Sequence, residues 1–131
     1  MRRLALAALC ANCAMPQPPP GSAGPAEAVR DLAAALQKGD AATAWSLLST
    51  RTQEQADEAA ARARAAAGDA GPESGRAMLF ASALPGGGVE ARVVIQGGDF
   101  AEVSAGGDGG SRVYHVVREG GRWRVDLDLP R

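Results

Sequence analysis

The sequence predicts an α+β fold, in which helices come first and an antiparallel sheet follows. From residue 25 to about residue 84, apolar side chains recur at the three- and four-residue spacing of amphipathic helices. From residue 89 onward they alternate with polar side chains, as in strands with one dry face. Glycine-rich stretches separate the strands, so each strand is expected to pair with the next as a meander.

The first two helices are marked by their ends. Pro25 suits the first turn of a helix, where a missing N–H costs nothing, and Gly39 suits the residue just after its end. Asp40 is placed to cap a second helix that runs to about residue 48. Trp45 falls on the apolar stripe of that helix, which favours a place in the core over ligand stacking.

A third helix is expected over residues 52–67, because Thr50 and Gln53 form a capping-box pattern ahead of it. This helix is rich in alanine, so it buries little apolar area. Residues 74–84 are expected to form a short helix, with a strand as the alternative.

The second half is expected to contain four strands, at residues 89–96, 100–104, 112–118 and 122–129. Residues 106–110 are expected to be a flexible glycine-rich loop, and Gly120-Gly121 the two-residue turn of the last hairpin. That turn sets the register of the hairpin, so the dry face that packs on the helices is predicted to hold Tyr114, Val116, Trp123, Val125 and Leu127.

Composition excludes several classes of function. The 14 Lys and Arg residues are balanced by 15 Asp and Glu residues and form no basic cluster, so no nucleic-acid partner is expected. The two cysteines, Cys10 and Cys13, lie in the leader, and His115 is the single histidine of the chain. No metal site and no cofactor are expected, since structural zinc sites need several Cys and His ligands and no dinucleotide or phosphate-binding motif occurs.

The N-terminus has the pattern of an export signal. Two arginines precede an apolar run that ends before Pro16, which is too short to cross a bilayer. We therefore divide the chain into a signal segment at 1–14, a Pro- and Gly-rich tether at 15–25 and one α+β domain at 26–131. The tether is expected to bury nothing.

The leader also resembles a bacterial lipoprotein signal, in which a cysteine is acylated and becomes the new N-terminus. Cys13 or Cys10 would be the lipidated residue, and the membrane would then be a partner through that anchor. Cleavage after Ala14 by the ordinary signal peptidase is the alternative. Either outcome predicts an exported protein of the bacterial cell envelope, periplasmic or membrane-anchored.

Two stretches of the chain resemble small secreted domains with the nuclear-transport-factor-2-like (cystatin-like) fold. They are residues 28–49, which include the Gly39-Asp40 junction and Ala44-Trp45, and residues 116–126, which include Gly120-Gly121 and Trp123. The resemblance implies a curved sheet that wraps the helices into a cone, and in some members a small apolar ligand or acid–base chemistry in that cone. It also implies that a homodimer can form through the sheet.

The candidate for chemistry is a cross-strand pair. The register set by Gly120-Gly121 places His115 opposite Asp126, where a base and its orienting carboxylate could meet. The same register turns both residues to the exposed side, beside Arg124 and Asp128. A solvated cross-strand pair needs no function to explain it, so the hypothesis of a catalytic pair is weaker than that of a structural ion pair.

These observations favour a non-catalytic exported domain that binds a small apolar ligand or an envelope protein. The aromatic residues that could line a ligand site are Trp45, Phe80, Tyr114 and Trp123. Two alternatives stay open: a small lyase or isomerase that uses His115 with Asp126, and a structural or accessory envelope lipoprotein.

Overall fold

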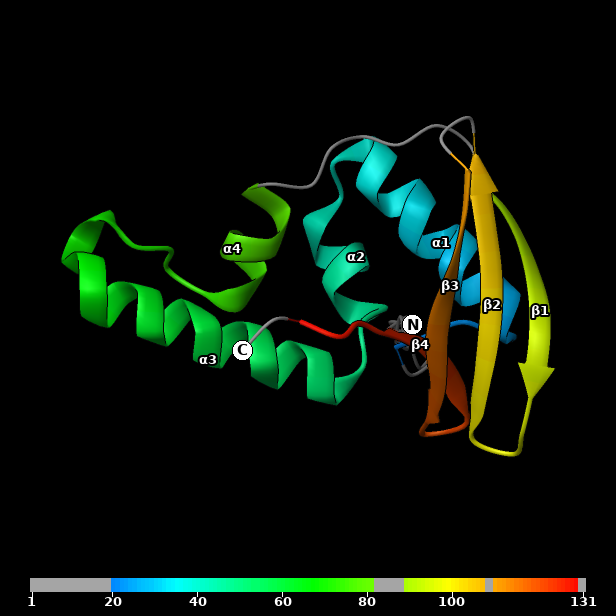
Figure 1. The fold of residues 1–131 in the computed structure, drawn as a ribbon. Coiled ribbons are helices and arrows are strands. Elements are labelled where there is room, and N and C mark those ends of the chain that lie inside the picture. The colour runs from blue at the N-terminus through cyan, green and yellow to red at the C-terminus, as the bar shows by residue number, and fades with distance from the viewer. Residues whose placement is uncertain (1–19, 82–88, 108–109, 130–131) are drawn as a thin grey trace, which may run out of the picture.

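The computed structural model describes residues 20–81, 89–107 and 110–129 and confirms the α+β fold. The elements are α1 (Pro25–Lys38), α2 (Ala41–Ser46), α3 (Thr50–Ala67), the 3₁₀ turn η1 (Gly68–Ala70), α4 (Gly75–Ala81), β1 (Glu90–Gln96), β2 (Phe100–Gly107), β3 (Gly110–Glu119) and β4 (Arg122–Asp126). The strands lie in the order β1-β2-β3-β4, and each is antiparallel to the next (Figure 1). No described helix is both long enough and apolar enough to cross a membrane.

The helices fall into two groups. Helix α1 lies along one face of the sheet and contacts all four strands. Helix α3 packs chiefly against α4, and the two extend away from the sheet as a unit that we call the α3–α4 arm (Figure 1). The packing of α1 on the sheet therefore forms the layer that positions the other elements of the molecule.

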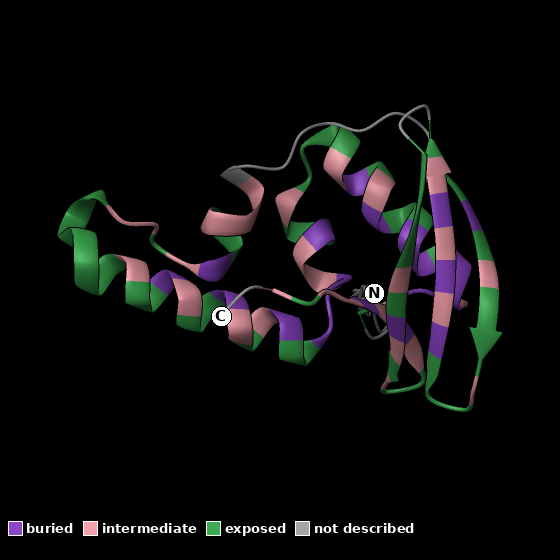
Figure 2. Ribbon diagram, in the orientation of Figure 1, coloured by how far each residue is buried: buried purple, intermediate pink, exposed green. Residues whose placement is uncertain are grey.

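The core lies between α1 and the face of the sheet that we call the inner face. Burial alternates along the strands, as the bands along β2 in Figure 2 show. The buried side chains include Ala28, Val29 and Leu32 of α1, Ala101, Val103 and Ala105 of β2, Val116 of β3, and Trp123 and Val125 of β4. The predicted dry face of the last hairpin is confirmed by Val116, Trp123 and Val125, while Tyr114 and Leu127 are partly buried against the same core.

The last hairpin forms as expected. Gly120 and Gly121 have positive φ values of 57° and 78°, which glycine adopts at no steric cost in a two-residue turn. The register pairs Glu119 with Arg122 and His115 with Asp126.

The free edge of β4 is closed by two segments from the N-terminal half. Ser22 exchanges two backbone hydrogen bonds with Trp123, at 2.8 and 2.9 Å. Farther along, the Val125 N–H donates to Leu47 O at 2.7 Å, and the Ser49 N–H donates to Val125 O at 2.8 Å. Ser22 is only 2% exposed, so the tether prediction is wrong at its C-terminal end, because the backbone there pairs with β4.

Several predicted boundaries shift for local reasons. The capping box at Thr50 is wrong, since α3 begins at Thr50 and the Ser49 hydroxyl accepts from the Thr52 N–H. Helix α2 ends at Ser46 because Leu48 turns to bridge Val125.

The glycine-rich stretch at 106–110 was expected to be a loop, but its described residues belong to strands. Gly106 pairs with Ser111 and Gly107 pairs with Gly110, so the β2–β3 hairpin is longer than predicted. Residues 74–84 contain α4 rather than a strand, although residues 82–84 lie outside the described part. The predictions for the leader, including Cys10 and Cys13, also concern residues outside the described ranges.

The α3–α4 arm depends on a close approach at Gly75. A Cβ atom at this residue would clash with the carbonyl carbon of Ala56 and with the backbone nitrogen of Asp57. The Gly75 N–H also donates to Asp57 Oδ1 at 2.9 Å. Glycine therefore lets α4 begin directly against the backbone of α3.

We expect Gly75→Ala to destabilise the protein by about 1–3 kcal/mol, since backbone atoms must move to admit the methyl group. Gly98→Ala is the matched control, because no heavy atom lies within 4 Å of its Cβ position. Its effect should stay within about 0.5 kcal/mol, as for other exposed positions. Urea unfolding of both variants measures the difference, and equal midpoints would contradict the close approach.

Candidate functional site

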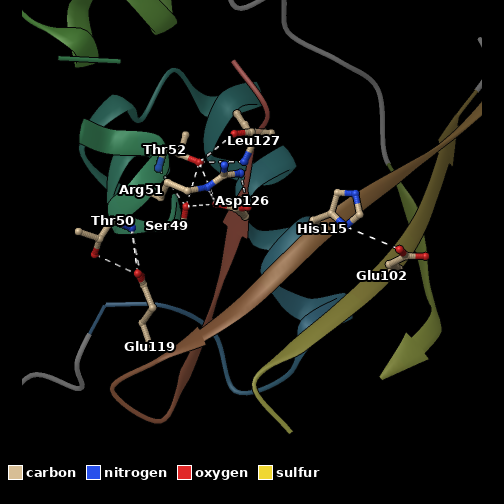
Figure 3. A network of polar contacts seen from close by, with 9 residues as sticks. All are labelled: Ser49, Thr50, Arg51, Thr52, Glu102, His115, Glu119, Asp126 and Leu127. Atoms are coloured by element: carbon tan, nitrogen blue, oxygen red, sulfur yellow. Dashed lines mark hydrogen bonds and ion pairs between the residues drawn. The ribbon is translucent and has the colours of Figure 1, made fainter. Parts of the chain in front are cut away.

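The register of the last hairpin places His115 and Asp126 opposite each other, but their side chains have different partners. The His115 side chain is 62% exposed, and its Nδ1 lies 3.8 Å from Glu102 Oε1 on β2. The Asp126 carboxylate instead contacts the start of α3 (Figure 3). The structure thus places the two residues in register and does not bring the imidazole and this carboxylate together.

Asp126 is the centre of a polar cluster, which we call the Asp126 network. Ser49 Oγ donates to Asp126 Oδ1 at 2.6 Å. The Arg51 guanidinium binds both carboxylate oxygens, through Nε at 3.2 Å and Nη2 at 2.7 Å. Thr52 Oγ1 lies 3.5 Å from Oδ1 and accepts the Leu127 N–H at 2.8 Å. Only 14% of the Asp126 side chain is exposed, contrary to the expected solvated position, because α3 begins over it.

The surroundings of Asp126 favour its ionised form. Partial burial raises the pKa of this carboxyl, but hydrogen bonds from Arg51, Ser49 and Thr52, with the charge of Arg51, lower the pKa below its usual value overall. Asp126 also lies beside the first turn of α3, where the positive end of the helix dipole favours a negative charge.

A second carboxylate from the same hairpin reaches the start of α3. The Thr50 N–H donates to both oxygens of Glu119, at 3.0 and 3.1 Å (Figure 3). Arg124 Nη1 lies 3.6 Å from Glu119 Oε2. Two acids of the β3–β4 hairpin therefore hold the first turn of α3.

These contacts of Asp126 and Glu119 connect the β3–β4 hairpin to the start of α3. The donors of Ser49 and Arg51 are directed at a carboxylate that is kept ionised, so that carboxylate is poorly suited to accept a proton. The described residues contain no group of three or more His, Cys, Asp or Glu side chains that could hold a metal ion. Sequence reasoning missed the Asp126 network, although the run Ser49-Thr50-Arg51-Thr52 was a visible set of donors.

The four aromatic candidates for a ligand site lie in or against the core. Trp123 is buried within it, and Trp45, Phe80 and Tyr114 are partly buried against it. The Arg112 guanidinium lies 5.6 Å from the centre of the Tyr114 ring. These rings therefore have packing roles in or against the core.

The other face of the sheet, which we call the outer face, carries apolar side chains in the open. Cross-strand pairing places Phe100 beside Val117, Glu102 beside His115, and Ser104 beside Val113 on this face. A β-bulge at Val94 lets Ile95 pair with Glu102. Ile95, Phe100 and Val113 are 50%, 53% and 50% exposed. We define the outer patch as Ile95, Phe100, Val113 and Val117 around the Glu102–His115 pair.

A hollow lies at the opposite end of the sheet from the Gly120-Gly121 turn. It measures about 920 Å³ and is lined by Arg30, Glu90, Arg92, Ser104 and Ser111, together with glycine backbone. Arg30 Nη2 donates to Ala91 O at 2.8 Å, so this guanidinium is already hydrogen-bonded to the backbone of β1. The lining is polar, which does not suit an apolar ligand.

No protein-family model matches the chain, and neither the curated proteins nor the solved structures contain a match.

The Asp126 network predicts a defined acid sensitivity. Because the folded-state pKa of Asp126 lies below its unfolded value of about 3.9, the network contributes stability in full above that pH. The contribution is lost as the pH falls through the folded-state pKa, where the unfolded chain binds more protons. We expect Asp126→Asn to cost about 1–3 kcal/mol at neutral pH.

Below about pH 4, the unfolding free energy of the same variant should fall less steeply with decreasing pH than that of the parent protein. The measurement is the unfolding free energy as a function of pH. Asp69→Asn is the matched control, since Asp69 is exposed in η1, beyond the far end of α3 from the network. It should keep the parent profile. If Asp126→Asn leaves the acid part of this pH dependence unchanged, the ionisation of Asp126 does not contribute to stability as expected.

Proposed function

We propose that the protein is an exported, non-catalytic domain that binds a protein of the cell envelope through the outer patch. The observation that carries this proposal is the half-exposed state of Ile95, Phe100 and Val113 on a face of the sheet that no described element covers. Exposed large apolar side chains gathered on one face, here around the polar Glu102–His115 pair, are typical of protein-contact surfaces.

The filled inner face favours a protein partner over a small apolar ligand. Val103, Val116 and Val125 are fully buried, and Ala28 of α1 packs in the same cluster. An apolar ligand needs a concave site of its own size, and these side chains occupy the space where the sheet and α1 meet. The outer patch is open and already displays apolar area.

The contacts of His115 favour binding over catalysis. A general base needs a partner that orients it, and Asp126 is engaged by Ser49 and Arg51. Glu102 lies 3.8 Å from His115, which is beyond a hydrogen bond. In a binding surface, the same pair supplies a polar centre that fixes orientation within the apolar ring.

Site-specific photocrosslinking in the native envelope tests the outer patch. We expect a crosslinker at Val113 to give one discrete adduct with an envelope protein, and Phe100→Ser in the same chain to abolish it. A crosslinker at Ala66, exposed on α3, is the control and should give no such adduct. The proposal fails if Val113 and Ala66 give the same adducts. An adduct of twice the chain mass would identify the partner as a second copy of this chain.

Export and anchoring are part of the proposal and have their own measurement. Intact mass spectrometry of the protein from its own envelope should show a new N-terminus at Cys13 or Cys10 with the added mass of a diacylglycerol group. An unmodified N-terminus near Met15 would indicate that the protein is exported without a lipid anchor. A chain that still begins with Met1 would contradict export by this signal.

A further inference from the structure

The outer edge of β1 is the open edge of the sheet among the described residues. The other edge, that of β4, is closed by Ser22 and the Leu47–Ser49 segment. Strand β1 pairs with β2 on one side, and no described backbone group pairs with its other side, at the margin of the sheet in Figure 1. An edge of this kind carries unpaired N–H and C=O groups, to which a further strand can be added.

Alternate residues of β1 direct their backbone groups toward this open edge. Ala91 O accepts a hydrogen bond from Arg30 Nη2 at 2.8 Å, as expected of a carbonyl that does not bond to β2. Every second residue of an antiparallel strand has the same orientation, which adds Val89 and Val93. A carbonyl oxygen accepts two hydrogen bonds, and the Arg30 side chain is 50% exposed, so Ala91 O can also accept from a further strand.

The part of β1 that can pair regularly is short. Residues 90–93 follow β2 in unbroken register, and the β-bulge at Val94 then shifts the register. A bulge bends its strand and interrupts the ladder of hydrogen bonds. A further strand therefore fits best against residues 89–93.

This short stretch carries two opposite charges, Glu90 and Arg92. Both residues are exposed, and the ion pairs of the described residues include neither of them. They lie two residues apart, so their side chains point to the same face of the strand. The pattern acid–alanine–arginine is complementary to itself when it is reversed, so a second copy of the same strand matches it in antiparallel orientation.

The charges and the bulge together select one register. A two-fold axis at Ala91 places Glu90 of each copy opposite Arg92 of the other. An axis at Arg92 would place two arginines opposite each other, which is unfavourable. An axis at Val93 would require pairing across the bulge of both copies.

We propose that two copies of this chain pair edge to edge through residues 89–93 of β1, antiparallel about a two-fold axis at Ala91. Val89 of each copy then faces Val93 of the other, beside the two Glu90–Arg92 pairs. The contact closes after two copies, because each copy has used its open edge. The inference does not rest on the proposed function, since the added strands extend the sheet in its own plane and leave the outer patch open.

Charge reversal in two chains tests this register in the native envelope. A photocrosslinker at Val94, which is 54% exposed just beyond the paired stretch, should give an adduct of twice the chain mass. Arg92→Glu alone and Glu90→Arg alone should each lose this adduct, because like charges then face each other across the axis. When both variants are produced together, with a mass tag on one of them, the adduct should return as a mixed pair, since every acid then faces an arginine.

The mixed pair separates pairing between chains from effects within one chain, because each chain in it is a variant that fails alone. Arg62→Glu, an exposed charge reversal on α3, is the matched control and should keep the adduct. The proposal is overturned if the parent gives no adduct of twice the chain mass, if Val94 crosslinks to a different protein, or if the mixed pair gives no adduct. The adduct expected from Val113 reports separately on the outer patch and should be the same in all these variants.

Discussion

The rest of the structure depends on the closure of the β4 edge. This strand pairs with β3 on one side, and on the other it meets Ser22 and the Leu47–Ser49 segment. An edge strand left open presents unpaired N–H and C=O groups to any passing chain, and these two short segments remove that exposure. They also fix where α1 starts and where α3 starts, because each helix follows directly from a residue paired with β4. The position of the helical layer is thus set by backbone hydrogen bonds as much as by the apolar core.

Much of this fold could be predicted from periodicity and turn residues. Pro25, Gly39 and Asp40 mark helix ends through local rules, and Gly120-Gly121 determines the register of the last hairpin, including the His115–Asp126 alignment. What could not be predicted rests on contacts distant in sequence. Ser22 looked like part of a linker because its partner, Trp123, lies at the other end of the chain. Asp126 was expected to be solvated because the alternation of apolar and polar side chains along β4 gives no information about α3, which begins over the end of that strand.

Several charged residues of the domain join its parts. Asp126 and Glu119 hold the start of α3, Asp57 holds the start of α4, and Arg30 covers a carbonyl on the β1 edge. Such contacts suit a chain with many small side chains, since alanine and glycine bury little apolar area and leave more of the orientation of each element to directed hydrogen bonds. The apolar side chains that remain in the open are then concentrated on the outer face, where no element of the described chain covers them.

The closure of β4 also has a consequence for the order of folding. The segment around Gly21 and Ser22 finds its partners about a hundred residues later, since the contact between Gly21 and Arg122 spans 101 residues. Pairings between residues so far apart must overcome a large loop-closure entropy, and they slow folding. During synthesis they cannot form until residues 122–126 have left the ribosome, about a hundred residues after Gly21 and Ser22. Until that strand arrives, α1 has only part of its sheet and α3 lacks the carboxylates that hold its first turn. The domain therefore stays incompletely folded until residues 122–126 are available to pair with Ser22 and to hold α3.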